Sequence, residues 1–486
     1  MKVLICASEC VPFAKTGGLA DVVGSLPKAL RALDVDVRVI MPKYKLIDYS
    51  YIKNMEHVCD FELLLGAERM YCGIDSLTVD GVRFYFVDNL ALFSQDMLYT
   101  GDEREGVRFV FFCRAVLECL PKIGFIPDVL HLNDWQTGLV SALLCGQYRH
   151  RDEYRDVKTV YTIHNLRFQG LFAWEFIKRL TGLDDSWYDP ERLEFYGLCS
   201  MMKAGIVFSD RVTTVSPTYA EEICSSYMGE RLDGLLTKFK DKLSGILNGI
   251  DYSLYDPAND PLLPCGYNVR AKSGKRTAKT ALQREFGLAQ RQDVAVIGFI
   301  ARLTSQKGLD LISCVLEDIM EQDVQLVFLG MGEKQYEQML QNAAQRYAGR
   351  LAFRAVLSDK LAHLIYAGSD LFLMPSLFEP CGLSQMIAMR YGSIPVVRET
   401  GGLKDSVMPY NKYTDMGTGF SFRNYNAHEM LYTIQHAVRY RQSDPPMWGR
   451  LMTRAMKTDF SWAESAKSYL GLYESMTAKE TVENEI

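Results

Sequence analysis

Short apolar runs alternate with longer amphipathic segments along most of the chain. The runs are rich in Val, Ile, Leu and Phe and end at Gly, Pro, Asn or Asp, which is typical of buried strands. Eleven runs predict strands: residues 2–8, 36–42, 82–88, 128–134, 158–165, 211–216, 242–250, 294–302, 324–332, 371–376 and 394–399. Continuous apolar strands that alternate with helices predict an α/β fold with parallel sheets covered on both faces.

The alternation loosens once and then restarts. Residues 249–292 contain Pro, Asp, Asn, Gly and a basic stretch, and a fresh strand follows. A chain of 486 residues is also too long for one core. We therefore predict two doubly wound, Rossmann-like domains, residues 1–247 and 248–458, followed by a packing helix and a frayed tail over 459–486. Ligands bind at the carboxyl ends of strands in such sheets, so the site is expected in a central cleft that both domains face.

Composition narrows the class of function. Apolar residues make up 48 % of the chain, charged residues 23 %, and the net charge is −6. No long basic tract is present, so no nucleic-acid surface is predicted, and no apolar run is long enough to cross a membrane. The 12 cysteines and 7 histidines are scattered without CxxC or HxxxH spacing. This predicts reduced thiols in the cytoplasm and neither a metal site nor a cofactor.

In the first half, three predicted strand ends carry unusual residues. The segment Lys15–Asp21 holds Gly17 and Gly18, which let a ligand approach the backbone at the start of a helix, where N–H groups favour an anion. A plain glycine turn with a solvated lysine explains the motif equally well. Asp134 follows the second strand end and could be only a helix cap. His164 and Asn165 end the third strand and could equally be structural.

The second half repeats this organisation. Arg302 and Lys307 are five residues apart in a predicted strand-to-helix loop, and two converging cations suit a diphosphate, although a solvated pair is the simpler alternative. Glu379 lies just before a helix start, where a carboxylate can bind sugar hydroxyls. The turn Thr400–Gly402 again ends a strand and opens a helix. Each half therefore has one glycine-rich turn that could bind an anion.

Seven ordered motifs together resemble bacterial glycogen synthases and plant starch synthases. They are KTGGLAD, NDWQTGL, HNLRFQG, LNGID, RLTSQKGLDL, PSLFEPCGLSQ and TGGLKDSV, and the resemblance runs from residue 1 to about residue 476. It implies the two-domain GT-B fold, with a final helix that crosses back to the N-terminal domain. It also implies a retaining hexosyltransferase that moves glucose from ADP-glucose to the non-reducing 4-hydroxyl of an α-1,4-glucan, without a metal.

Residue roles follow from the positions in these motifs. The resemblance implies that Arg302 and Lys307 neutralise the diphosphate as it leaves, and that His164 holds the glucose 6-hydroxyl. Glu379 would bind sugar hydroxyls, and Asp134 would position a sugar. The remaining motif residues implied to bind substrate are Lys15, Gly17, Gly18, Asp21, Asn165, Asn248, Cys381, Gly382, Thr400, Gly401 and Gly402. Tyr99 lies outside the seven motifs and is expected to line the same cleft.

The sequence departs from the family pattern twice. Many retaining GT-B enzymes have a second Glu eight residues after the first, and here Ile387 stands at that position. Ser358 stands where the family often has a Tyr, which leaves the choice between ADP-glucose and UDP-glucose open. Two alternatives remain: another retaining GT-B transferase with a different donor or acceptor, or a catalytically silent glucan-binding protein.

Overall fold

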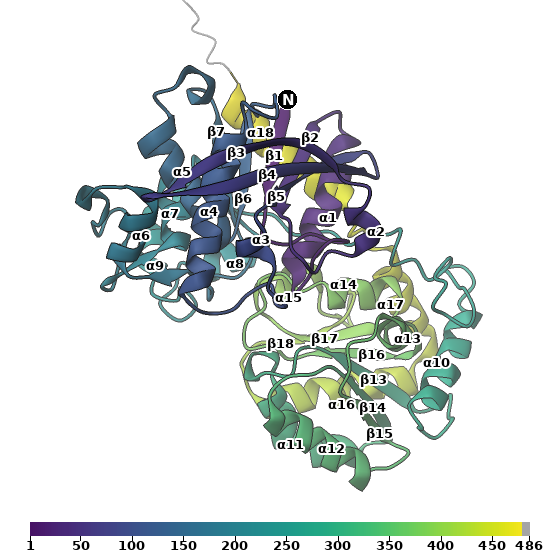
Figure 1. Ribbon diagram of the computed structural model, residues 1–486. Coiled ribbons are helices and arrows are strands. Elements are labelled where there is room, and N and C mark those ends of the chain that lie inside the picture. Colours follow the sequence, from purple (N-terminus) through teal and green to yellow (C-terminus); the bar gives the residue numbers. More distant parts are fainter. Residues whose placement is uncertain (479–486) are drawn as a thin grey trace, which may run out of the picture. The chain divides into compact units, whose positions relative to one another are not determined.

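The computed structural model describes residues 1–478, and the chain forms two compact units (Figure 1). Unit 1 comprises Met1–Gly249 and the segment from Trp462 onward, and unit 2 comprises Ile250–Ser461. Most of the expected frayed tail, residues 479–486, lies outside the described residues. No helix within the described residues is long and apolar enough to cross a membrane.

Unit 1 is built on a nine-stranded sheet in the order β12-β11-β7-β6-β1-β2-β5-β4-β3. The first seven strands in this order run parallel, and β4 and β3 add an antiparallel edge. The strands are β1 (Lys2–Cys6), β2 (Asp36–Pro42), β3 (Glu56–Leu65), β4 (Glu68–Val79), β5 (Val82–Asp88), β6 (Val129–Asn133), β7 (Lys158–Ile163), β11 (Arg211–Thr214) and β12 (Leu243–Gly245). A small separate sheet consists of β8 (Leu171–Phe172), β10 (Leu198–Ser200) and β9 (Glu194–Phe195).

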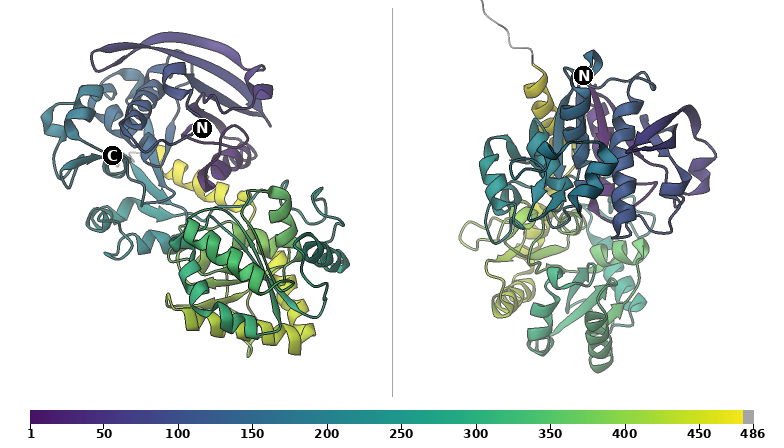
Figure 2. Two further views of the ribbon diagram at one scale, coloured as in Figure 1. Left: turned by 60° about the horizontal axis from the view of Figure 1, so that its bottom comes forward. Right: turned by 60° about the vertical axis from the view of Figure 1, so that its left-hand side comes forward.

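The described part of unit 1 also contains ten α-helices. They are α1 (Gly18–Arg31), α2 (Tyr49–Ile52), α3 (Leu90–Phe93), α4 (Glu103–Cys119), α5 (Trp135–Leu143), α6 (Trp174–Thr181), α7 (Met201–Phe208), α8 (Pro217–Glu222), α9 (Asp233–Lys238) and α18 (Trp462–Thr477). The last of these is the returning helix, and it packs beside α1 (Figure 2).

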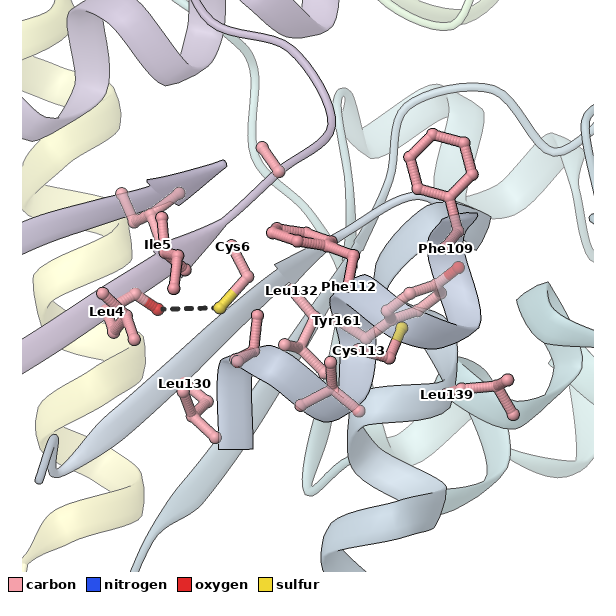
Figure 3. Close-up of a cluster of buried hydrophobic side chains, with 14 of the residues drawn as sticks. Leu4, Ile5, Cys6, Phe109, Phe112, Cys113, Leu130, Leu132, Leu139 and Tyr161 are labelled. Carbon is pink, nitrogen blue, oxygen red and sulfur yellow. Dashed lines mark hydrogen bonds between the residues drawn. The ribbon is translucent and has the colours of Figure 1, made fainter. Parts of the chain in front are cut away.

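Side chains on β6 alternate between two packed faces, as a strand requires. Leu130 and Leu132 join residues of β1 and α4 in a buried cluster (Figure 3). Between them, His131 faces α18, where its Nδ1 lies 2.7 Å from the Tyr473 hydroxyl. Burial lowers the pKa of His131 to about 3, so the ring is neutral. The strand that ends at the candidate site is therefore fixed from both sides.

Unit 2 contains a six-stranded parallel sheet in the order β15-β14-β13-β16-β17-β18. Its strands are β13 (Ala295–Ile300), β14 (Val324–Leu329), β15 (Leu351–Arg354), β16 (Leu371–Met374), β17 (Ile394–Arg398) and β18 (Phe420–Phe422). Its helices are α10 (Ser273–Glu285), α11 (Leu309–Glu321), α12 (Lys334–Arg346), α13 (Asp359–Gly368), α14 (Ser384–Arg390), α15 (Gly401–Ser406), α16 (Ala427–Ser443) and α17 (Pro445–Lys457). The predicted doubly wound α/β class is confirmed in both units.

Several strands were not anticipated from the sequence. The hairpin of β3 and β4 lies at the edge of the unit 1 sheet (Figure 2), and many of its residues are exposed on one face. A half-exposed antiparallel strand alternates polar and apolar residues and does not form a continuous apolar run. Strands β8, β9, β10, β15 and β18 have at most four residues each and lie outside the eleven predicted runs.

Candidate active site

Four predicted site segments of unit 1 follow the carboxyl ends of strands in the same sheet. The segment that contains Lys15 follows β1, Asp134 follows β6, His164 follows β7, and Asn248 follows β12. Strands β7, β6 and β1 are neighbours and run parallel, so their carboxyl ends lie along one edge. This is the edge at which open α/β sheets bind ligands.

The glycine turn of unit 1 already holds an anion from its own chain. Glu9 Oε2 accepts hydrogen bonds from the backbone N–H of Thr16 at 2.5 Å and of Gly17 at 3.2 Å. Lys15 Nζ forms an ion pair with Asp21 Oδ1 at 2.7 Å on the first turn of α1. A Cβ on Gly18 would meet nothing within 4 Å. The backbone at this position is therefore open to close approach from outside the unit.

Tyr99 lies in the same group of side chains. Its hydroxyl shares a hydrogen bond with Ser8 Oγ at 2.7 Å and donates to Glu9 Oε1 at 3.4 Å. Burial and the nearby Glu9 raise the pKa of Tyr99 well above its ordinary value, so its hydroxyl keeps its proton. Tyr99 is thus tied to the segment that precedes the glycine turn.

Asp134 does not cap α5 with its side chain. It has a left-handed backbone conformation, φ 54°, and its Oδ1 accepts the backbone N–H of His164 at 2.7 Å and of Asn165 at 3.5 Å. The carboxylate therefore joins the ends of β6 and β7. Burial raises the pKa of Asp134 to about 7, and Glu9 contributes in the same direction through like charge.

His164 is fixed in one neutral form. Its Nε2 lies 2.9 Å from Asn133 Oδ1. The amide nitrogen of Asn133 donates to the carbonyls of Cys6 and His131, so its oxygen faces the imidazole and accepts from Nε2–H. Burial lowers the pKa of His164 to about 3. The Nδ1 atom of a neutral ring with this tautomer can accept a hydrogen bond from a ligand hydroxyl.

Two asparagines complete the unit 1 group. The side-chain oxygen of Asn165 accepts the backbone N–H of Arg167 at 3.1 Å, which shapes the loop after β7. Asn248 is buried, and its Oδ1 has no hydrogen-bond partner among residues 1–478. A buried amide oxygen without a partner costs free energy, so the position is suited to a donor supplied by a ligand.

In unit 2, a cation and a carboxylate meet at the ends of neighbouring strands. Lys307 follows β13 and Glu379 follows β16, and Lys307 Nζ lies 2.6 Å from Glu379 Oε2. Ser376 Oγ donates to the same oxygen at 3.0 Å. The two loops are joined by a backbone bond from Leu377 N–H to the Gln306 carbonyl. Arg302 is exposed in the first loop.

The glycine turn of unit 2 packs directly against the Glu379 loop. A Cβ on Gly401 would lie 2.0 Å from the Glu379 carbonyl oxygen, and a Cβ on Gly402 would lie 2.1 Å from that of Cys381. Gly401 is also left-handed, with φ 43°. The Gly402 N–H donates to the carbonyls of Glu379 and Pro380, both at 3.2 Å. Packing inside the unit therefore requires both glycines, and the Gly402 amide is already engaged.

The remaining predicted residues of unit 2 lie in the Glu379 loop and in the glycine turn. Cys381 is buried, Gly382 has φ 71° and begins the approach to α14, and Thr400 is fully buried at the start of α15. Within residues 1–478, no three His, Cys, Asp or Glu side chains are grouped so that they could hold a metal ion.

Comparison with known proteins identifies the family. The starch synthase catalytic domain matches residues 2–238, and the glycosyl transferases group 1 domain matches residues 283–444. A glycogen synthase of Geobacillus thermodenitrificans is 53 % identical over 481 residues, covering 99 % of both chains. The chain belongs to the glycogen synthase and starch synthase family. It is therefore a glycosyltransferase of the GT-B fold.

Further relatives agree with this assignment. A glycogen synthase of Anoxybacillus flavithermus is 50 % identical and covers 98 % of both chains. Among solved structures, the catalytic domain of starch synthase IV from Arabidopsis thaliana, bound to ADP and acarbose, superposes with a TM-score of 0.91 at 34 % identity, covering 98 % of this chain and 99 % of that one. A sucrose-phosphate synthase from Thermosynechococcus elongatus, 18 % identical with a TM-score of 0.62, shares the fold.

The structure gives a local role to each of the two residues that depart from the expected patterns, Ser358 and Ile387. Ser358 is the N-cap of α13, and its hydroxyl accepts the Leu361 N–H at 3.3 Å. Ile387 is buried within α14, where a carboxylate would have to lose its hydration. A second glutamate is therefore unsuited to position 387 in this chain.

Each unit's group of candidate residues also contains side chains that the sequence did not single out. Glu9 binds the glycine turn, Asn133 fixes the tautomer of His164, and Ser376 donates to Glu379. Asn133 and Ser376 stand within or beside the quoted motifs at strand ends, so proximity to those motifs is the signal that could have found them. Glu9 has no such signal, because its role depends on how the chain folds back between residues 9 and 17.

Proposed function

We propose that this enzyme transfers glucose from ADP-glucose to the non-reducing 4-hydroxyl of an α-1,4-glucan and retains the anomeric configuration. Its relatives are named glycogen synthases, and the starch synthase IV structure contains ADP. The single observation that carries the proposal is the contact between Lys307 and Glu379, with the exposed Arg302 in the same loop as Lys307. It combines the two chemistries that a nucleotide sugar requires, cations for a diphosphate and a carboxylate for sugar hydroxyls.

In unit 2, Arg302 and Lys307 act on the leaving group. As the bond between the anomeric carbon and the β-phosphate oxygen breaks, its electron pair leaves with the phosphate, and the two cations stabilise the growing charge. Thr400 and Gly401 lie at the start of α15 and are proposed to contact the same phosphates. We leave Gly402 out of this contact because its N–H already donates to two carbonyls. Cys381 and Gly382 would shape the loop that presents Glu379.

The environment of Glu379 favours sugar binding over nucleophilic attack. One of its oxygens accepts from both Lys307 and Ser376, which neutralises its charge and lowers its nucleophilicity. A covalent route through Glu379 is thereby disfavoured. We propose that the acceptor 4-hydroxyl attacks on the face from which the diphosphate leaves, through a short-lived oxocarbenium ion. The hydroxyl proton passes to the departing phosphate oxygen, so charge and protons balance.

In unit 1, the proposed roles concern the sugars and the phosphate. His164 Nδ1 would accept a hydrogen bond from the glucose 6-hydroxyl, since Nε2–H is used by Asn133. Asp134 and Asn248 would position sugar hydroxyls, with Asn165 and Tyr99 shaping the surrounding surface. Lys15, which forms an ion pair with Asp21, would add positive charge near the diphosphate, and the Gly17–Gly18 backbone would allow the diphosphate to approach.

The absence of disulfide bonds among residues 1–478 supports a reducing compartment. All twelve cysteines are free thiols, so we propose that the reaction takes place in the cytoplasm.

Measurement of ADP release tests the proposal. The purified enzyme is mixed with glycogen and ADP-glucose, and separately with glycogen and UDP-glucose. We expect ADP release that depends on glycogen, with radiolabelled glucose incorporated through α-1,4 bonds. Faster release from UDP-glucose would contradict the donor assignment, and no release from either donor would favour a silent glucan-binding protein. Trapping of a glucosyl-Glu379 adduct would exclude the front-face route.

A further inference from the structure

The carboxylate of Glu9 is the least expected feature of the unit 1 site. It is buried, with 4 % of its surface exposed, directly after β1. Besides the N–H groups of Thr16 and Gly17, it accepts the Thr16 hydroxyl, which lies 3.2 Å from Oε1 and 3.1 Å from Oε2. One side chain thus satisfies three donors of the segment that connects Lys15 to α1.

Glu9 is itself held from the opposite side. The Tyr99 hydroxyl donates to it, and the neighbouring Ser8 carbonyl accepts the Tyr44 hydroxyl at 2.8 Å. The loop that carries Tyr99 is fixed by α4, where Glu105 accepts the N–H groups of Thr100 at 2.7 Å and Gly101 at 2.5 Å. Also from α4, the buried Arg108 donates to the carbonyl of Leu98 in that loop at 3.0 Å. These contacts leave Glu9 little freedom to move.

The charge of Glu9 has the wrong sign for a site that attracts a diphosphate. A carboxylate beside a phosphate repels it, and this repulsion is strong where water is excluded. The contribution of Glu9 must therefore be geometric. It forms the turn before any ligand arrives, so the ordering of residues 15–18 costs the ligand no binding free energy. It also occupies the Gly17 amide, which leaves Lys15 and the Gly18 backbone to face a ligand.

We propose that Glu9 is a positioning residue that preorganises the Lys15–Gly18 turn for the nucleotide-sugar donor. This inference rests on the proposed function for the identity of the donor. It assigns a role to a residue outside the seven motifs, and it acts through the shape of the turn rather than through contact with substrate.

Three substitutions at Glu9 separate geometry from charge. Glu9→Ala removes the carboxylate that accepts from three donors of the turn and should raise the KM for ADP-glucose on the order of tenfold or more, while the KM for glycogen stays within about twofold. Glu9→Gln keeps the acceptor oxygen without the charge and should restore the donor KM to within about threefold of wild type. Glu9→Asp keeps the charge but is one methylene too short, and should resemble Glu9→Ala.

Asp210 provides a matched control. Its Oδ2 accepts the backbone N–H of Thr159 at 2.7 Å and the Thr159 hydroxyl at 2.8 Å, the same pair of groups that Glu9 accepts from Thr16. It precedes β11, at the amino ends of the parallel strands, away from the candidate site. Asp210→Asn should lower thermal stability without changing the KM for ADP-glucose. An equal change in donor KM for this variant would show that general loosening of unit 1 explains the effect.

Amide hydrogen exchange tests the turn without any assay of activity. In Glu9→Ala, exchange in a peptide that spans residues 13–20 should become at least about tenfold faster, with full protection retained in β1 and β6. This readout holds even if wild type proves inactive with ADP-glucose, which would contradict only the proposed function. Unchanged exchange in Glu9→Ala would overturn the inference, as would a better donor KM in Glu9→Asp than in Glu9→Gln.

Discussion

The two glycine turns look alike in sequence and differ in what requires their glycines. In unit 2, a Cβ added to Gly401 or Gly402 would lie 2.0 Å or 2.1 Å from a backbone carbonyl oxygen, which is a severe steric overlap. In unit 1, a Cβ on Gly18 would meet nothing within 4 Å, and a Cβ on Gly17 would be 3.9 Å from Glu9 Oε1. The Gly401–Gly402 pair is therefore needed for the fold of unit 2, whereas the Gly17–Gly18 pair leaves space that no atom of unit 1 fills.

This difference shows how two similar motifs can serve different purposes. A glycine that packs against its own chain is a structural requirement, whatever else the turn does. A glycine whose missing side chain leaves open space is better explained by a partner from outside, here the donor. Substitution therefore should affect folding in unit 2 and catalysis in unit 1.

The largest effect is expected for Gly401→Ala. The new Cβ overlaps the Glu379 carbonyl, and the left-handed backbone disfavours any side chain, so unit 2 should lose at least about 3 kcal/mol of stability. Circular dichroism and calorimetry should show a lower Tm for unit 2. A Tm equal to that of wild type would mean that the loop around Glu379 yields easily, and the contrast between the turns would fail.

Substitution of the two lysines near these turns should also have very different effects on stability. Lys307→Met leaves Glu379, with 10 % of its side chain exposed, without its cation, and should cost about 3–5 kcal/mol of stability. Lys15→Met breaks an ion pair with a half-exposed lysine and should cost at most about 1 kcal/mol. Both variants should lose transferase activity. Comparable urea midpoint shifts for the two would contradict the assigned environments.

Gly18→Ala sharpens the comparison from the other side. It should leave the free energy of unfolding within about 0.5 kcal/mol of wild type, since no atom of unit 1 is in the way. If the donor approaches here, kcat/KM for ADP-glucose should fall on the order of tenfold. The kinetics are measured at saturating glycogen. If the variant folds normally and keeps full activity, the donor does not approach the backbone at Gly18.

The smallest effect is expected in the pH dependence of activity and stability that Asp134 of unit 1 produces. The pKa of Asp134 is raised to about 7, so the carboxyl takes up a proton as pH falls through 7. If its charge assists the reaction, activity should fall on the acidic side with an apparent pKa near 7, and Asp134→Asn should remove that limb. The contribution of Asp134 to the free energy of unfolding should change in the opposite direction and decrease as pH rises. A raised pKa destabilises the fold as pH increases from the unfolded value toward 7, so Asp134→Asn should be relatively more stable at pH 8 than at pH 4.

The sequence predicts the parallel core better than its surroundings. Strands such as β1, β13 and β16 are buried on both faces, and their continuous apolar runs can be recognised from the amino-acid sequence. The hairpin β3–β4 has one exposed face and mixes polar with apolar positions, so it leaves no continuous run. Local composition therefore identifies the strands whose ends hold the site and misses the edge of the sheet.

Candidate residues were predictable where a motif carries the chemistry. Lys307 and Glu379 were each noticed at a strand end, and the structure brings them together because β13 and β16 are neighbours. Glu9 and the contrast between the glycine pairs could not be found in this way. The distance from an added Cβ to a carbonyl oxygen is set by the packing of two loops, and Gly401 and Glu379 are 22 residues apart in the sequence, so no spacing rule predicts it.

The helix α18 has a consequence for the order in which the protein is made. His131 on β6 is hydrogen-bonded to Tyr473, so the sheet of unit 1 lacks one of its covering helices, α18, until the end of the chain is available. During synthesis, all of unit 2 leaves the ribosome before that helix does. Unit 1 therefore begins first and finishes last, and a chain released before residue 462 would carry a completed second unit and an open first one.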